Sequence, residues 1–220
     1  MTSSSGVAVL GKQVCLRHIL FAALLPMFLF VLWHDERFVY IHSDEKWAYY
    51  FPVRWLVAPH VLGGLLALLI GPFQFSSRFR QRHLSTHRVL GRVYLASVGV
   101  SAVVALYLSA IHQTDLQDKE WVFTLDLAWL ITGWMALAAV RNGNIEVHRQ
   151  WMARNYAFTT VFVTVRVLNA LLIPEAYGLA PGWILLLATL LFTELRLGWR
   201  SVFTNQRSRP LRPGEGSTHG

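Results

Sequence analysis

The chain has 220 residues, of which 54% are hydrophobic and 15% are charged, whereas a soluble domain carries about 25% charged residues. This composition excludes an ordinary water-soluble domain, so we expect a single membrane domain over residues 1–203 with the lipid bilayer as its partner. The formal net charge of +8 does not indicate a nucleic-acid binder, because the basic residues lie in short runs between apolar stretches rather than on one face.

Apolar runs long enough to cross a bilayer recur six times along the chain. The first run continues into Trp33 and acidic residues without a cleavage site, so we interpret it as a retained span rather than a signal peptide. All six are predicted to be helices, because a backbone in lipid must satisfy its own hydrogen bonds and the runs lack two-residue alternation. The fold class is therefore all-α, a polytopic membrane helical bundle with six transmembrane helices. The predicted spans cover about residues 18–33, 57–75, 90–111, 121–140, 151–173 and 181–198, and residues 204–220 are predicted to be a disordered cytoplasmic tail.

Basic and acidic residues alternate from one loop to the next. Of the 20 lysines and arginines, 15 fall in the N-terminal segment, the second and fourth loops and the C-terminal region, while the other loops hold most of the acidic residues. By the positive-inside rule, this pattern predicts a multi-pass protein of the inner (plasma) membrane with both termini in the cytoplasm.

Two predicted cytoplasmic span starts resemble one another. Both have a His-Arg pair followed by an arginine and a tyrosine, with the copies 61 to 62 positions apart: His87, Arg88, Arg92 and Tyr94, then His148, Arg149, Arg154 and Tyr156. The spacing predicts a four-helix core, made of helices two to five, that arose from a tandem two-helix repeat, with helices one and six as additions. The alternative is coincidence, because His and Arg reach lipid phosphates at any such interface.

Ionisable side chains within the spans form the first candidate site. Asp126 in helix four and Arg166 in helix five are predicted at similar depth in the outer half of the membrane, with His60 and Asn169 nearby. One interpretation is an outward-facing polar pocket, in which His60 or Asp126 handles a proton and Arg166 fixes an anionic or carbonyl-bearing small molecule. The other is a buried pair that only pins helix four to helix five.

The repeated histidines form the second candidate site. If the repeats pack as a pseudo-symmetric bundle, His87 and His148 would face one another and could ligate one haem iron, as in a haem b, with Arg88, Arg92, Arg149 or Arg154 at its propionates. The alternative is that both histidines sit at the interface and pair with acids or lipid. A second haem is not predicted, because helix four offers Asp126 where a ligand would be needed.

Small residues recur every four positions in helix two, at Gly63, Ala67 and Gly71, followed by a turn that contains Gln74. This stripe favours close helix packing over catalysis. The chain has no phosphate-cradling glycine loop and no serine nucleophile elbow, so enzymatic activity stays undetermined.

These motifs together resemble a known bacterial membrane family. The segment from Pro59 to Ala170 is similar to domain of unknown function 2306, and the two His-Arg blocks are the most specific part of the resemblance. That family implies a polytopic membrane protein and no particular reaction. A looser similarity is to transmembrane cytochromes of the b type, from which only the pairing of His87 with His148 is carried over.

Three functions from different classes follow from the sequence. The first is a redox or haem-binding membrane protein that uses His87 and His148. The second is a small-molecule binding or transport protein, or a cofactor-free membrane enzyme, built around His60, Asp126 and Arg166. The third is an accessory subunit whose polar residues only fix helix packing.

Overall fold

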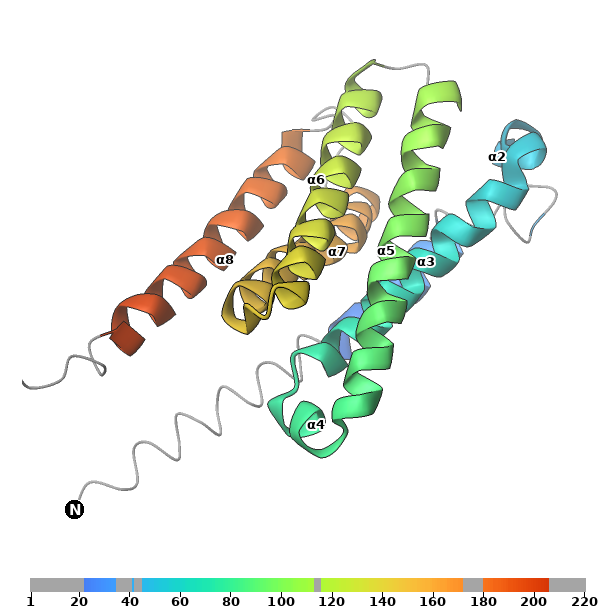
Figure 1. Ribbon diagram of the computed structural model, residues 1–220. Helices are drawn as coiled ribbons and strands as arrows, with labels where there is room; N and C mark the ends of the chain where they lie inside the picture. The colour runs from blue at the N-terminus through green and yellow to red at the C-terminus, as the bar shows by residue number, and fades with distance from the viewer. Residues whose placement is uncertain (1–21, 35–40, 42–44, 113–115, 172–179, 206–220) are drawn as a thin grey trace, which may run out of the picture.

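The protein is an all-helical bundle in the computed structural model, which describes residues 22–34, 41, 45–112, 116–171 and 180–205. Every regular element in these ranges is helical, as the hydrophobic pattern predicted. An apolar helix over Ala22–His34 comes first, and the remaining elements follow in chain order (Figure 1). They are α2 (Glu45–Tyr50), the 3-10 turn η2 (Phe51–Val53), α3 (Arg54–Gln74), α4 (Ser77–Arg82), α5 (Leu84–His112), α6 (Leu116–Arg141), α7 (Ile145–Leu171) and α8 (Ala180–Asn205).

Three segments of the described chain are long and apolar enough to cross a membrane: Trp47–Gln74, Leu84–Ile111 and Lys119–Arg141. The predicted count of six spans is therefore not confirmed. The helix over Ala22–His34 is apolar but short within the described residues, and the predicted start of the first span lies outside them. The long helix α7 is less apolar, because its length includes Arg149, Arg154 and Arg166.

Apolar side chains on the outside of the bundle support a lipid environment. Exposed residues recur along one face of α5 at spacings of three and four residues, and the same pattern is found on α6 and α8. Such stripes would be costly in water but match a surface that faces lipid chains. The exposed stripes are Val100, Val103, Tyr107 and Ile111 on α5, Phe123, Leu127, Ile131 and Trp134 on α6, and Ile184, Leu187, Leu191 and Leu195 on α8.

Four helices form a closed ring around the core. Helix α3 packs on α5, α5 on α6, α6 on α7, and α7 returns to α3, so α5 and α7 occupy one diagonal and α3 and α6 the other. Helix α8 packs outside on α7, and the helix over Ala22–His34 packs on α3 and α7 through a separate apolar cluster of Phe28, Val31, Leu68 and Val163. The predicted core of helices two to five corresponds to α3, α5, α6 and α7, with the first and last helices as additions.

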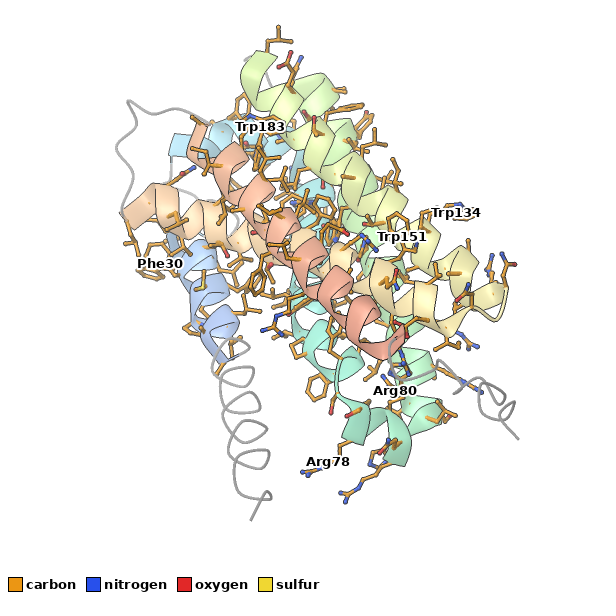
Figure 2. All side chains as sticks on the ribbon, turned by 90° about the vertical axis from the view of Figure 1, so that its left-hand side faces the viewer. Phe30, Arg78, Arg80, Trp134, Trp151 and Trp183 are labelled. Carbon is orange, nitrogen blue, oxygen red and sulfur yellow. The ribbon has the colours of Figure 1, made fainter. Side chains whose placement is uncertain are left out.

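The two ends of the ring are distinct. At one end, here called the α4 end, α3 and α6 finish and α5 and α7 begin; at the other, called the α2 end, α2 leads into α3. Figure 1 shows α4 at the first of these ends, and Figure 2 shows Arg78 and Arg80 there and Trp183 towards the second end.

Helices α5 and α7 begin earlier than their apolar runs indicated. They start at Leu84 and Ile145, so His87 and His148 are each the fourth residue of a helix rather than part of a loop. The arginine-rich loop expected between helices two and three contains α4, whose N-terminus is capped by a hydrogen bond from the Phe79 amide to Ser76 Oγ at 3.2 Å. Helix α8 continues to Asn205, two residues into the predicted tail, and residues 206–220 lie outside the described ones.

A tight turn sets the α6–α7 pair antiparallel. Gly143 has a φ of 73°, a left-handed conformation that glycine adopts without steric cost. The amide of Asn144 donates to the Ala139 carbonyl at 2.9 Å and that of Gly143 to the Val140 carbonyl at 3.1 Å, which is the Schellman pattern that ends a helix. The Asn144 side chain then caps α7 by accepting from the Val147 amide at 3.2 Å. The turn therefore fixes where His148 enters the core.

Candidate functional site

Polar side chains run along one face of α7 through the interior of the core. His148, Asn155, Thr159 and Arg166 are spaced by seven, four and seven residues, which places them on one line of the helix. The line passes from the α4 end to the α2 end, between the apolar side chains of the core.

At the centre of this line lies a set of buried, hydrogen-bonded side chains that we call the middle layer: Tyr94, Trp129, Thr132, Asn155 and Thr159. Asn155 is fully buried and donates from Nδ2 to the Trp129 carbonyl at 2.7 Å and to Thr132 Oγ1 at 2.9 Å. Its Oδ1 accepts the Tyr94 hydroxyl at 2.7 Å, and Trp129 Nε1 donates to Thr159 Oγ1 at 3.0 Å. The side-chain polar groups of this layer thus satisfy one another, and the layer ties α5 to α7 across the diagonal.

On the α2 side of the middle layer lies a carboxyl group without hydrogen bonds. Asp126 of α6 is 1% exposed, and neither of its oxygens has a hydrogen-bond partner. Arg166 of α7 is half-buried and acts on Asp126 electrostatically. A buried carboxyl group normally has hydrogen bonds, so its two bare oxygens mark a place where something polar is needed. We call Asp126 and Arg166 the Asp126 site.

The other two residues predicted for this site, His60 and Asn169, have different surroundings in the structure. His60 of α3 donates from Nδ1 to the Ser101 carbonyl at 3.0 Å, and Ser101 Oγ donates back to the His60 carbonyl at 2.8 Å. This exchange joins α3 to α5, while Asp126 lies on the helix diagonal to α3. Asn169, one turn beyond Arg166, is exposed. The structure therefore brings Asp126 to Arg166 and ties His60 to Ser101.

On the α4 side of the middle layer the two repeated histidines approach one another. His87 and His148 lie on the diagonal helices α5 and α7 and are within electrostatic reach of each other. His148 donates from Nδ1 to the Ala136 carbonyl at 2.8 Å, which fixes its tautomer because a carbonyl can only accept. His87 Nδ1 is buried and has no hydrogen-bond partner. The nearness of the two imidazoles was predicted from the repeat; a haem between them stays a prediction.

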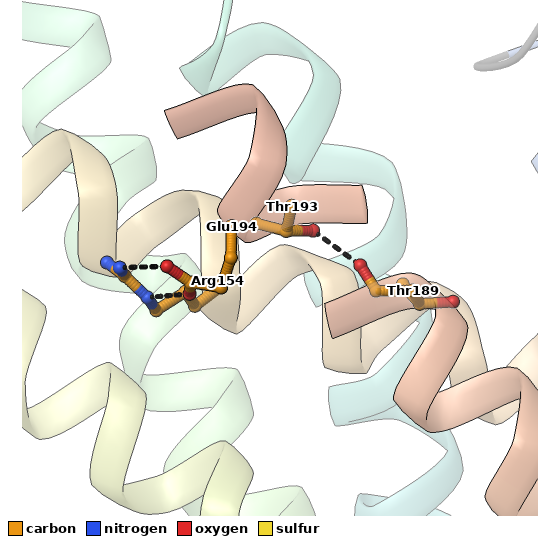
Figure 3. Close-up of polar contacts among 4 residues, drawn as sticks. All are labelled: Arg154, Thr189, Thr193 and Glu194. Carbon is orange, nitrogen blue, oxygen red and sulfur yellow. Dashed lines mark hydrogen bonds and ion pairs between the residues drawn. The ribbon is translucent and has the colours of Figure 1, made fainter. Parts of the chain in front are cut away.

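The four arginines proposed for haem propionates differ in their surroundings. Arg88, Arg92 and Arg149 are exposed. Arg154 is bound in a bidentate ion pair to Glu194 of α8, with Nε and Nη2 at 2.5 and 2.7 Å from the two carboxylate oxygens (Figure 3). Arg154 therefore joins α7 to α8. Within the described ranges, no group of three or more His, Cys, Asp or Glu is arranged to hold a metal ion.

Glycines in α3 allow two neighbouring helices to approach closely. A Cβ added at Gly63 would lie 2.8 Å from the Ser97 carbonyl oxygen, and one added at Gly71 would overlap the Tyr156 ring. The Tyr156 hydroxyl donates to the Leu68 carbonyl at 3.1 Å, so the ring is held across Gly71. The packing role predicted for the small-residue stripe is confirmed at both glycines.

Sequence reasoning missed the middle layer, whereas it noted Gln74 at the end of α3 as a residue that could hydrogen-bond a neighbouring backbone or a ligand. Tyr94 and Tyr156 were noted only as repeat markers, and Asn155, Thr159 and Trp129 were not singled out. The signal that could have identified Asn155 and Thr159 is the spacing of polar residues on α7 at intervals of seven and four, which places them on one line of the helix. Gln74, the last residue of α3, is 8% exposed and its Nε2 has no hydrogen-bond partner.

Comparison with known proteins identifies a family without a described activity. The family model described as "Predicted membrane protein (DUF2306)" matches residues 57–195, more than half of the chain. No curated protein and no solved structure matches the chain significantly. The chain belongs to the DUF2306 family, and the matched range contains α5, α6 and α7 in full and α3 from Val57 onwards.

Proposed function

We propose that this member of the DUF2306 family of predicted membrane proteins binds a small organic anion at the Asp126 site and takes up a proton at Asp126 as it does so. The observation that carries the proposal is the buried carboxyl group of Asp126, whose two oxygens have no hydrogen bond although an arginine is within electrostatic reach. Intramembrane ionisable residues are costly and mark ligand or proton sites by default.

The partial exposure of Arg166 supports entry of a ligand from one side. Arg166 is half-buried, whereas Asp126 is 1% exposed, so an incoming anion meets the guanidinium first. The middle layer closes the other side, because its side chains already satisfy one another and offer no free donor to a ligand. With the α4 end in the cytoplasm, as the basic residues predict, this site opens towards the outer face of the membrane.

The chemistry of the pair supports coupling of the anion to a proton. An organic carboxylate pairs with the Arg166 guanidinium in the geometry that arginine prefers. The anion and the Asp126 carboxylate then compete for one cation in a medium of low dielectric. Protonation of Asp126 from the outer solution removes this repulsion, and the resulting O–H donates a hydrogen bond to the bound anion. One proton therefore accompanies each anion.

The test uses the purified full chain in detergent with short monocarboxylates from acetate to benzoate, each compared with its neutral amide. We expect a carboxylate, but not its amide, to raise the midpoint of thermal unfolding in a saturable way. When the experiment starts at an alkaline pH at which Asp126 is ionised, a pH indicator in weak buffer should report uptake of about one proton per bound carboxylate. Arg166→Gln should abolish binding, and Asp126→Asn should retain binding without proton uptake.

Asn169→Ala is the matched control, because this exposed residue lies one turn from Arg166 on the same helix. It should behave as the wild type in both measurements. A purely structural role of the pair makes a different prediction: Asp126→Asn and Arg166→Gln would lower protein yield and unfolding temperature, and no carboxylate would bind to the wild type. That result would refute the proposed function.

A further inference from the structure

At the α4 end of the core, far from the Asp126 site, two buried nitrogen atoms have no hydrogen-bond partner. Gln74, at the last position of α3, is 8% exposed and its Nε2 has no hydrogen-bond partner. Its Oε1 lies against α5, since a Cβ added at Gly91 would be 3.3 Å from that oxygen. His87, whose buried Nδ1 also has no partner, precedes Gly91 by one turn on the same helix.

The surroundings of these two nitrogens are basic. Arg80 of α4, Arg88 of α5 and His148 of α7 all act electrostatically on His87. The nearby acids on α7 and α8 already have cationic partners: Glu146 is 3.6 Å from Arg149, and Glu194 binds Arg154. Among the described residues, an amide N–H group of α3, an imidazole of α5, guanidinium groups of α4 and α5 and an imidazole of α7 thus lie at this end of the bundle, and the two acids named above are paired with arginines.

We propose that this cluster, here called the Gln74 site, binds a phosphate-bearing anion at the α4 end of the bundle. A phosphate group offers several oxygens in a tetrahedral arrangement, which suits donors that approach from different helices. Gln74 Nε2 and the imidazole of His87 supply the buried donors, and Arg80 and Arg88 supply positive charge at the opening.

Two sources could supply the phosphate: a lipid headgroup or a soluble phosphate compound. The short helix α4 carries Arg78, Arg80 and Arg82 at the end of the bundle, where the phosphate layer of a bilayer would lie (Figures 1 and 2). The chemistry of recognition is the same in both cases, so the experiment distinguishes them. The site is separate from the Asp126 site and does not depend on the proposed function.

The experiment measures thermal unfolding of the detergent-purified full chain by tryptophan fluorescence. One arm adds inorganic phosphate against chloride at equal ionic strength, and the other adds phosphatidylglycerol against phosphatidylcholine in mixed micelles. We expect a saturable rise of the unfolding midpoint in at least one arm. A rise with phosphatidylglycerol alone identifies a lipid headgroup, and a rise with inorganic phosphate identifies a soluble anion.

Variants connect the effect to the cluster. Gln74→Glu keeps the shape of the side chain but replaces the donor by an acceptor, so it should weaken binding roughly ten- to hundredfold. If this variant fails to fold, Arg80→Gln tests the same site, with Arg78→Gln as the matched control, because Arg80 is half-buried and Arg78 is exposed on the same helix. Arg80→Gln should weaken binding, while Arg78→Gln should not.

Three outcomes would overturn the proposal. No rise in either arm beyond the chloride and phosphatidylcholine controls would show that the site binds no phosphate. Equal binding by the wild type, Gln74→Glu and Arg80→Gln would place the phosphate elsewhere. A strong visible absorbance of the purified protein that is lost in His87→Ala would assign the imidazoles to a haem iron, which needs their lone pairs rather than their N–H groups.

Discussion

The contact between Gly71 and Tyr156 gives the sharpest prediction for the stability of the core. A Cβ at Gly71 would overlap the Tyr156 ring, which is held there by the hydrogen bond to the Leu68 carbonyl. Gly71→Ala must therefore displace the ring or separate α3 from α7. Overpacking of this kind costs about 1–3 kcal/mol, and the loss of the hydroxyl hydrogen bond costs about 1 kcal/mol more.

Gly99 supplies the matched control. It also lies within a helix, but a Cβ added there would meet no atom within 4 Å. The gain in helix propensity, about 1 kcal/mol, is common to both Gly→Ala changes and cancels when they are compared. The free energy of unfolding of Gly71→Ala should therefore be about 2–4 kcal/mol lower than that of Gly99→Ala.

The assay is unfolding of the purified protein by SDS in mixed micelles, followed by tryptophan fluorescence. A double variant identifies the cause: Tyr156→Leu removes the ring, so Gly71→Ala should cost at least about 1 kcal/mol less in that background. If Gly71→Ala and Gly99→Ala have equal free energies of unfolding, or if the Tyr156→Leu background changes nothing, the close packing of α3 on α7 described above is wrong.

Two further predictions concern hydrogen bonds at the centre and at the edge of the core. Tyr94→Phe leaves Asn155 Oδ1 without its donor and should lower the free energy of unfolding by about 1–2 kcal/mol in the same assay. An unchanged free energy of unfolding would mean that another donor, such as water, bonds to Asn155 Oδ1. Arg154→Gln breaks the ion pair with Glu194, whose side chain is 50% exposed, so it should lower the free energy of unfolding by less than about 1 kcal/mol. This difference should become smaller at high salt. A larger loss that does not depend on salt would show that the pair is more shielded from solvent than its exposure indicates.

The fold class could be predicted from the sequence, but several helix boundaries could not. Long apolar runs predicted membrane spans within α3, α5 and α6, and the structure has three helical segments there that are long and apolar enough to cross a membrane. The first turns of α5 and α7 contain polar residues such as His87 and His148, which lower the local hydropathy although the backbone is already helical. Hydropathy indicates whether a helix is surrounded by lipid or by water, and it does not reveal that a polar segment is helical. It therefore does not detect α4, in which three of six residues are arginines.

The candidate sites were predicted with unequal success for a physical reason. Depth along a helix follows from residue number, so the similar depth of Asp126 and Arg166 could be inferred before the structure. Which face of a helix meets which neighbour depends on the rotation of each helix, and a single sequence does not give it. This is why the bond of His60 to Ser101 and the bond between Tyr94 and Asn155 were not anticipated.

The arrangement of satisfied and unsatisfied polar groups divides the core into two parts. Buried polar atoms without hydrogen-bond partners lie at the Asp126 site and at the Gln74 site, and the hydrogen-bonded middle layer lies between the two sites. A ligand or proton that passed from one site to the other would have to break the bonds of Asn155, which is fully buried and holds partners on α5 and α6. With the middle layer closed, we therefore expect the two proposed sites to act independently. Coupling between them would require α5 and α7 to move apart, and Tyr94→Phe removes the hydrogen bond that resists this movement.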